Sequence, residues 1–179
     1  MDAVAALRAG RPVLLPTDGV YGLCCALDEE AVVRLYELKG RDRRRPTAII
    51  AASPEALREL IPELDLDAVL PGPFTSIVPN PARRFRWLAS EEAGTIGVRL
   101  PVLPPATRAV LDAVGAVAAT SANEPGEPPA ASLDEVPERI RRGCGAEIDA
   151  GRLSGTPSTV VDLTGEAPVV LRQGAGELP

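Results

Sequence analysis

Short apolar runs alternate along the chain with longer amphipathic stretches. The apolar run 13–15 has the composition of a buried strand, and the segments 47–52, 95–100, 158–163 and 168–173 also read as strands. Glycine and proline fall mostly between these runs. They therefore mark turns between elements.

Helical spacing of apolar residues appears between the predicted strands. Segment 28–40 carries its apolar residues on one stripe, with acids in the first turn and a lysine and a glycine at its end, which predicts a helix. We also expect a short helix from Asp2 to Gly10 and another over 104–114. The capping-box pattern SLDE predicts a further helix that opens at Ser132.

Strands and helices that alternate without an internal repeat favour an α/β fold with a mixed sheet. The 179 residues fit one domain, 1–179, and no linker divides them. We expect the acidic tail after Gly174 to be frayed. No segment is long enough to cross a bilayer, and the acidic start does not resemble a signal peptide, which predicts a cytoplasmic protein.

Composition narrows the function classes. The net charge of −6 disfavours a protein that binds nucleic acid through a broad basic face. The absence of histidine excludes Ser-His-Asp hydrolysis and histidine-ligated zinc. The three cysteines match neither a disulfide framework nor a metal-ligand spacing, so we expect no metal site made by the protein. Chemistry must therefore depend on positioning and fixed charge.

The basic segment 39–45 is the first candidate for chemistry. Lys39 is the single lysine in a chain that otherwise uses arginine, and Arg41 and Arg45 follow it. An ammonium point charge combined with guanidinium forks could hold a triphosphate. The alternative is that Lys39 only complements the helix dipole and that the arginines are solvated.

A second candidate is the segment 119–123, where an apolar run ends in hydroxyl and amide side chains. If the strand continues, Ser121 and Asn123 point the same way and suit a nucleotide or a carboxylate. A purely local turn leading into Pro125 and Gly126 is the alternative.

Four weaker signals lie elsewhere in the chain. The turn 16–19 between two apolar runs indicates a hairpin that could also line a cleft. This hairpin region supplies Thr17 and Tyr21. The other three signals are a hydroxyl before a strand, Ser158, an arginine at the end of a strand, Arg172, and a threonine after a rigid turn, Thr75. By themselves, these patterns predict an α/β domain with an anion-binding crevice rich in hydroxyl groups.

Taken in order, these segments resemble the signatures of the YrdC-like family. The matching segments are PTDGVYGL, KGR with RP, PGPFT, VRLP, TSAN, PSTVVD and LRQG, which together span about residues 14–174. Seven segments in the correct order are far more specific than any one of them. The chain is similar to the short bacterial form of the family.

The resemblance implies a twisted mixed β-sheet flanked by helices around a positively lined cavity. It also implies an enzyme that converts L-threonine, bicarbonate and ATP into threonylcarbamoyl-AMP and pyrophosphate, with Mg²⁺ accompanying ATP. The product would pass to a tRNA threonylcarbamoyl transferase complex, which modifies adenosine in tRNA.

The resemblance also implies roles for individual residues. The residues assigned to ATP are Lys39, Arg41, Arg45, Asn123 and Arg172, with Lys39 and Arg41 acting on the phosphates as the catalytic pair. The residues assigned to threonine are Thr17, Tyr21, Thr75, Ser121 and Ser158.

Two positions depart from the family pattern. Gly19 stands where the family usually has a threonine hydroxyl, and losing that hydrogen bond would cost about 0.5 to 1.5 kcal/mol. Asp42 replaces a usual proline. These departures keep a related carbamoyl-handling enzyme with another acceptor as one alternative. A non-catalytic RNA-binding module is a second alternative, suggested by the arginines at 41–45 and near Trp87.

Overall fold

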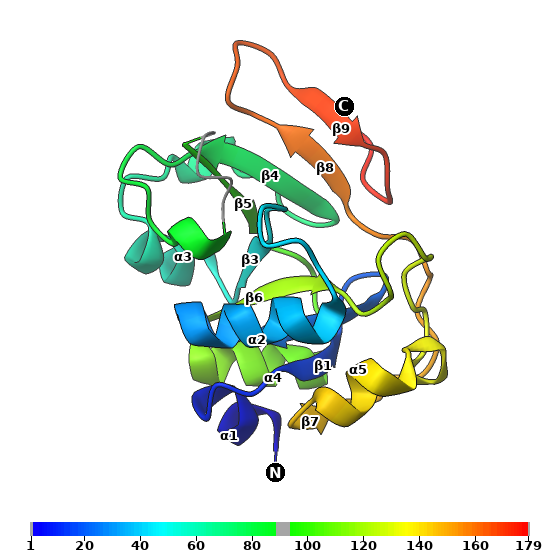
Figure 1. The fold of residues 1–179 in the computed structure, drawn as a ribbon. Coiled ribbons are helices and arrows are strands. Elements are labelled where there is room, and N and C mark those ends of the chain that lie inside the picture. Colours follow the sequence, from blue (N-terminus) through cyan, green and yellow to red (C-terminus); the bar gives the residue numbers. More distant parts are fainter. Residues whose placement is uncertain (1, 89–93, 179) are drawn as a thin grey trace.

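A computed structural model describes residues 2–88 and 94–178 and shows a single nine-stranded mixed sheet among them (Figure 1). The strand order is β7-β1-β2-β6-β3-β5-β4-β8-β9. The bounds are β1 Val13–Pro16, β2 Tyr21–Cys25, β3 Ala48–Ala51, β4 Phe74–Pro79, β5 Thr95–Arg99, β6 Ala116–Ser121, β7 Ala146–Glu147, β8 Thr159–Asp162 and β9 Val169–Arg172.

The strand pairing brings distant parts of the sequence together. The pairs β1/β7, β3/β5 and β4/β8 are parallel, and the other neighbours are antiparallel. In the β2/β6 pair, Gly22 lies opposite Ser121, and in the β4/β8 pair, Thr75 lies opposite Val160. The predicted hairpin at 16–19 is confirmed, since β1 and β2 are antiparallel neighbours with Pro16 opposite Tyr21.

Helices cover both faces of the β1/β2 region. The helices are α1 Ala3–Arg8, α2 Glu29–Lys39, α3 Pro54–Leu60, α4 Pro105–Val114 and α5 Glu138–Gly143, with 3₁₀ turns at Leu66–Ala68, Arg86–Leu88 and Leu133–Glu135. Leu14 and Leu23 belong to the core cluster that contains Leu35 of α2, whereas Val13 and Leu15 belong to the cluster that contains α1 and α4 residues. This alternation confirms the predicted α/β class with a mixed sheet flanked by helices. No helix in the described part of the chain is long and apolar enough to cross a membrane.

The helix predicted to open at Ser132 is wrong in its position. A 3₁₀ turn covers only Leu133–Glu135, and Ser132 makes no side-chain cap. Pro137 forces Val136 into an extended conformation with ψ of 127°, which ends the turn. The α-helix then begins at Glu138.

The prediction of a frayed tail after Gly174 is also wrong up to Gly176. The buried hydroxyl of Thr159 accepts hydrogen bonds from the backbone N–H groups of Gly174 and Gly176, each at 2.9 Å, and donates to the Gly176 carbonyl at 2.7 Å. The Ala175 N–H also donates to the Pro157 carbonyl at 2.9 Å. These contacts dock the tail on the start of β8.

Candidate functional site

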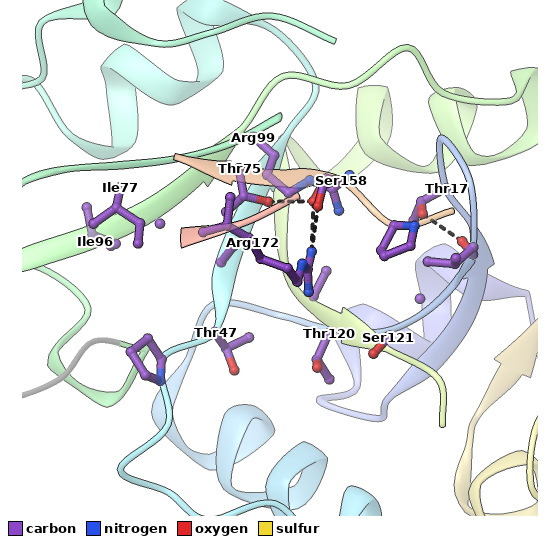
Figure 2. Close-up of a pocket in the computed structure, with 18 of the residues that line it drawn as sticks. Thr17, Thr47, Thr75, Ile77, Ile96, Arg99, Thr120, Ser121, Ser158 and Arg172 are labelled. Atoms are coloured by element: carbon purple, nitrogen blue, oxygen red, sulfur yellow. Dashed lines mark hydrogen bonds between the residues drawn. The ribbon is translucent and has the colours of Figure 1, made fainter. Parts of the chain in front are cut away.

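A cavity of about 290 Å³ lies against the middle of the sheet and collects most of the segments singled out in the sequence (Figure 2). It is lined by side chains from β2, β3, β4, β5, β6, β8 and β9 and from the turns between them. The hydroxyl-bearing lining residues are Thr17, Thr47, Thr75, Thr95, Thr120, Ser121 and Ser158. The charged lining residues among those the structure describes are Arg41, Arg99 and Arg172.

A hydroxyl pair and an arginine form one side of the cavity. The hydroxyl groups of Thr75 and Ser158 are 2.8 Å apart, because β4 and β8 run side by side. Arg172 from β9 donates to the Ser158 carbonyl at 2.7 Å and lies 3.4 Å from its hydroxyl. Figure 2 shows these three residues on one side of the cavity and Thr47, Thr120 and Ser121 on the other.

Two arginines in the cavity have no carboxylate partner among the described residues. Arg41 donates to the Pro46 carbonyl at 2.7 Å, and its Nε is buried without a hydrogen-bond partner in the described structure. Burial lowers the pKa of Arg41, and burial together with the nearby charge of Arg99 lowers the pKa of Arg172. A bound anion would stabilise both guanidinium groups.

The third arginine is bound within the protein. Arg99 donates to Asp18 at 2.5 Å, and the side chains of this pair are only 12% and 9% exposed. The Asp18 Oδ2 and the Arg99 Nε are both buried without a partner among the residues described. Arg99 therefore enters the cavity in an orientation set by Asp18.

Arg99 and Asp18 lie in two of the matching segments, VRLP and PTDGVYGL, but the sequence predicts no role for either residue. The alternation in β5 carried a usable signal, because Val98 is buried in the core and the next residue along the strand, Arg99, must point to the opposite face. The pairing with Asp18 could not be found in this way, since the two residues are 81 positions apart.

Lys39 is buried beside the cavity and binds the end of β6. Its ammonium group, on a residue only 3% exposed, donates to the Ser121 carbonyl, to the Asn123 carbonyl at 2.9 Å and to the Asn123 Oδ1 at 3.0 Å. Burial, followed by the charge of Arg41, lowers the pKa of Lys39 to about 8. The lysine thus ties the end of α2 to the segment that follows β6.

Comparison with known families explains this combination of segments. A family model described as "Telomere recombination", which covers the Sua5, YciO and YrdC proteins, matches residues 5–174. The chain belongs to this family. The resemblance inferred from the ordered YrdC-like motifs is confirmed.

Two curated relatives of this chain carry the same functional name. Proteins named threonylcarbamoyl-AMP synthase from Escherichia coli and Halorhodospira halophila are 36% and 35% identical to it. The alignments cover 97% and 96% of this chain and 96% and 92% of those proteins.

Solved structures of the family show the same fold. Pyrococcus abyssi Sua5, in a crystal structure with L-threonine, matches with a TM-score of 0.85 and 37% identity over 96% of this chain. This chain spans about half of that protein, 53% of its length. Escherichia coli YciO matches with a TM-score of 0.84 and 29% identity, covering 98% of this chain and 88% of that one.

The structure brings together six of the residues predicted from the YrdC-like motifs and leaves four outside the cavity lining. The six lining residues are Thr17, Arg41, Thr75, Ser121, Ser158 and Arg172, and the four others are Tyr21, Lys39, Arg45 and Asn123.

Tyr21 lies on the opposite face of β2 from Gly22, which lines the cavity. Its hydroxyl donates to the Gly151 carbonyl at 2.8 Å, lies 3.0 Å from Asp149 Oδ1 and accepts from the Ala150 N–H at 2.9 Å. Arg45 is exposed in the loop that follows α2. Tyr21 therefore supports the cavity wall from behind, and Arg45 lies outside the enclosed part.

Proposed function

We propose that this chain is a threonylcarbamoyl-AMP synthase. The observation that carries the proposal is one cavity in which Arg41 and Arg172, two arginines with no carboxylate partner among the described residues, lie near the hydroxyl pair of Thr75 and Ser158. The arginines suit a polyphosphate, and the hydroxyl groups suit a small polar amino acid. The curated relatives with this name support the same assignment.

The reaction needs no protein nucleophile. The amine of L-threonine condenses with bicarbonate, with loss of water, to give a carbamate. A carbamate oxygen then forms a bond to the α-phosphorus of ATP, the bond from that phosphorus to the bridging oxygen breaks, and pyrophosphate leaves. Positive groups fixed in place stabilise the charge that develops on the phosphate oxygens.

We assign the phosphate-binding role to Arg41 and Arg172. Their fixed guanidinium forks can each donate two hydrogen bonds to a phosphate group. Arg45 would meet the outer phosphates, because it lies exposed in the loop that connects Arg41 to the cavity-lining Pro46. Mg²⁺ would arrive with ATP and be held chiefly by phosphate oxygens.

We assign the amino-acid end to the hydroxyl groups of Thr17, Thr75, Ser121 and Ser158. The complex of Pyrococcus abyssi Sua5 with L-threonine supports threonine as the acceptor. In this chain the Thr17 hydroxyl donates to the Val20 carbonyl at 2.6 Å, which fixes the turn beside the cavity.

Lys39 and Asn123 serve the site in a different way from the phosphate-binding arginines. Because the Lys39 ammonium group already binds oxygens of Ser121 and Asn123, we propose that it holds the end of β6 in place for ATP and threonine. Its buried positive charge still adds to the potential in the cavity. Asn123 would then act on the nucleotide through this shared geometry.

The ion pairs made by surface arginines favour the enzyme over an RNA-binding module. Arg43 and Arg44 form ion pairs with Glu37 and Asp42 at 2.9 and 2.7 Å. Arg84 pairs with Glu63 at 2.7 Å. These pairs neutralise much of the charge that phosphate binding needs.

We propose that the product passes in the cytoplasm to a tRNA threonylcarbamoyl transferase complex, with at most weak direct contact to RNA.

Pyrophosphate release tests this function. The protein with ATP and Mg²⁺ should release pyrophosphate only when both L-threonine and bicarbonate are present. Replacing threonine in turn by serine, valine and carbamoyl phosphate separates this synthase from a related enzyme with another acceptor. Equal release without threonine would exclude the proposed acceptor.

A further inference from the structure

Segment 154–158 leads into the cavity, and its first residues are packed against Gly19. A Cβ atom at Gly19 would lie 2.1 Å from the carbonyl oxygen of Thr156 and 3.1 Å from the hydroxyl oxygen of Ser154. The Gly19 carbonyl accepts a hydrogen bond from the Gly155 N–H at 2.8 Å. The segment therefore occupies the space that a side chain at position 19 would need.

Gly174 makes an equivalent contact with the end of the segment, at Pro157 and Ser158. A Cβ atom at Gly174 would lie 2.2 Å from the Pro157 carbonyl oxygen and 2.6 Å from the Ser158 carbonyl oxygen. The Ala175 N–H donates to the same Pro157 carbonyl at 2.9 Å. Backbone atoms form these contacts, so rotation of a side chain cannot relieve a clash.

Close contacts with neighbouring backbone atoms, and not a left-handed backbone conformation, explain why glycine occupies these two positions. Neither Gly19 nor Gly174 is among the glycines with positive φ. The close contacts with the packed segment, and not a left-handed φ, therefore oppose a side chain at both positions.

The packed segment ends in residues of the site. Pro157 and Ser158 line the cavity, and the Ser158 hydroxyl lies 2.8 Å from that of Thr75. We propose that Gly19 and Gly174 are positioning residues that clamp segment 154–158 and thereby hold the Ser158 hydroxyl at the amino-acid end of the cavity. The inference rests on the proposed function for its kinetic consequence and on packing alone for its structural one.

The proposed clamp gives Gly19 a packing role that the family pattern did not indicate. The family pattern indicates that Gly19 lacks a hydroxyl for threonine, and by that interpretation Gly19→Thr should lower the KM for threonine. The structure assigns the opposite result, because the new side chain would strike the Thr156 carbonyl and displace the segment. The two interpretations predict opposite changes in the KM for the acceptor.

Hydrogen exchange and kinetics on the full chain test the clamp. The variants are Gly19→Ala, Gly19→Thr and Gly174→Ala. The matched control is Gly165→Ala, where a Cβ atom would meet only the Ala167 carbonyl oxygen at 3.9 Å, an ordinary contact. Amide exchange is followed across 153–158 and in α2, and KM is measured separately for L-threonine and for ATP.

We expect faster exchange across 153–158 in all three test variants, with α2 and the control unchanged. The KM for threonine should rise by about two- to tenfold, the equivalent of one lost hydrogen bond, and more than the KM for ATP. Three outcomes would each overturn the clamp. They are exchange across 153–158 at the wild-type rate in the variants, a lower KM for threonine in Gly19→Thr, and faster exchange with an unchanged KM for threonine. If the variants at one glycine do not fold, the variant at the other glycine decides.

The exchange measurement also separates the clamp from the proposed function. Faster local exchange in a protein whose wild type shows no threonine-dependent turnover would leave the packing role intact and reject the synthase assignment. Threonine-dependent turnover by the wild type, with unaltered exchange in the variants, would support the synthase assignment and reject the clamp.

Discussion

The ammonium group of Lys39 donates a hydrogen bond to the side-chain oxygen of Asn123 at 3.0 Å and a second one to its backbone carbonyl at 2.9 Å. The family resemblance implies that both residues act on ATP. In the structure they bind each other, and Lys39 also binds the Ser121 carbonyl. Any effect of Lys39 on ATP therefore operates partly through the position of the segment after β6.

Replacing the ammonium group should destabilise the protein. Lys39→Met keeps the aliphatic chain but leaves the buried oxygens of Ser121 and Asn123 unpaired, which we expect to lower the free energy of unfolding by about 1 to 3 kcal/mol. Urea denaturation measures the change. The control, Arg34→Met on the exposed side of the same helix, should shift the midpoint much less. Equal midpoints for wild type and Lys39→Met would refute a structural role for the ammonium group.

The stability of the protein should depend on pH through Lys39. Its pKa is about 8 in the folded protein and 10.5 ordinarily, because burial disfavours the charged form. Between these values the unfolded chain binds more protons at this residue than the folded chain does. The Lys39 contribution to the unfolding free energy must therefore increase as the pH rises from about 8 to about 10.5. Urea midpoints of wild type and Lys39→Met at several pH values test this, and parallel pH profiles would show that the pKa is not shifted.

The buried pair of Asp18 and Arg99 should be sensitive to loss of one charge. Asp18→Asn leaves the Arg99 guanidinium group uncompensated at a site that is nearly closed to solvent, and we expect a loss of about 3 kcal/mol in unfolding free energy. The control is Asp112→Asn, which removes a half-exposed pair with Arg108 and should cost only about 0.5 kcal/mol. Thermal or urea unfolding measures both, and similar small changes would show that Asp18 does not hold Arg99.

The guanidinium fork of Arg172 should matter for ATP. Arg172→Lys keeps the charge but cannot bind the Ser158 carbonyl and a phosphate in the same geometry, so the KM for ATP should rise about tenfold. The exposed pair of Arg152 and Glu135 supplies the control, Arg152→Lys, with no expected change. An unaltered KM for ATP in Arg172→Lys would place the nucleotide elsewhere.

Local patterns predicted most of the fold. The apolar runs became β1, β3, β5, β8 and β9, and the amphipathic segment 28–40 became α2, because burial and spacing are written directly in the sequence. The helix at Ser132 failed because the effect of Pro137 outweighed the capping pattern.

The site was harder to predict from the sequence than the fold. Motif order identified Arg41, Thr75 and Ser158 as residues of one site, and the structure brings them together. Charge alone could not distinguish a lysine that faces phosphate from one that binds buried carbonyl groups. The packing of Gly19 against Thr156 depends on backbone contacts between segments far apart in the sequence, which no local pattern reveals.

Mass spectrometry of the reaction products tests the proposed synthase activity. The protein is incubated with ATP, Mg²⁺, bicarbonate and L-threonine, and samples without each component serve as controls. We expect a threonylcarbamoyl-adenylate ion that appears only in the complete mixture and shifts in mass with ¹³C-bicarbonate and with isotopically labelled threonine. Consumption of ATP without this product, or an adenylate that carries no threonine label, would contradict the proposed synthase activity.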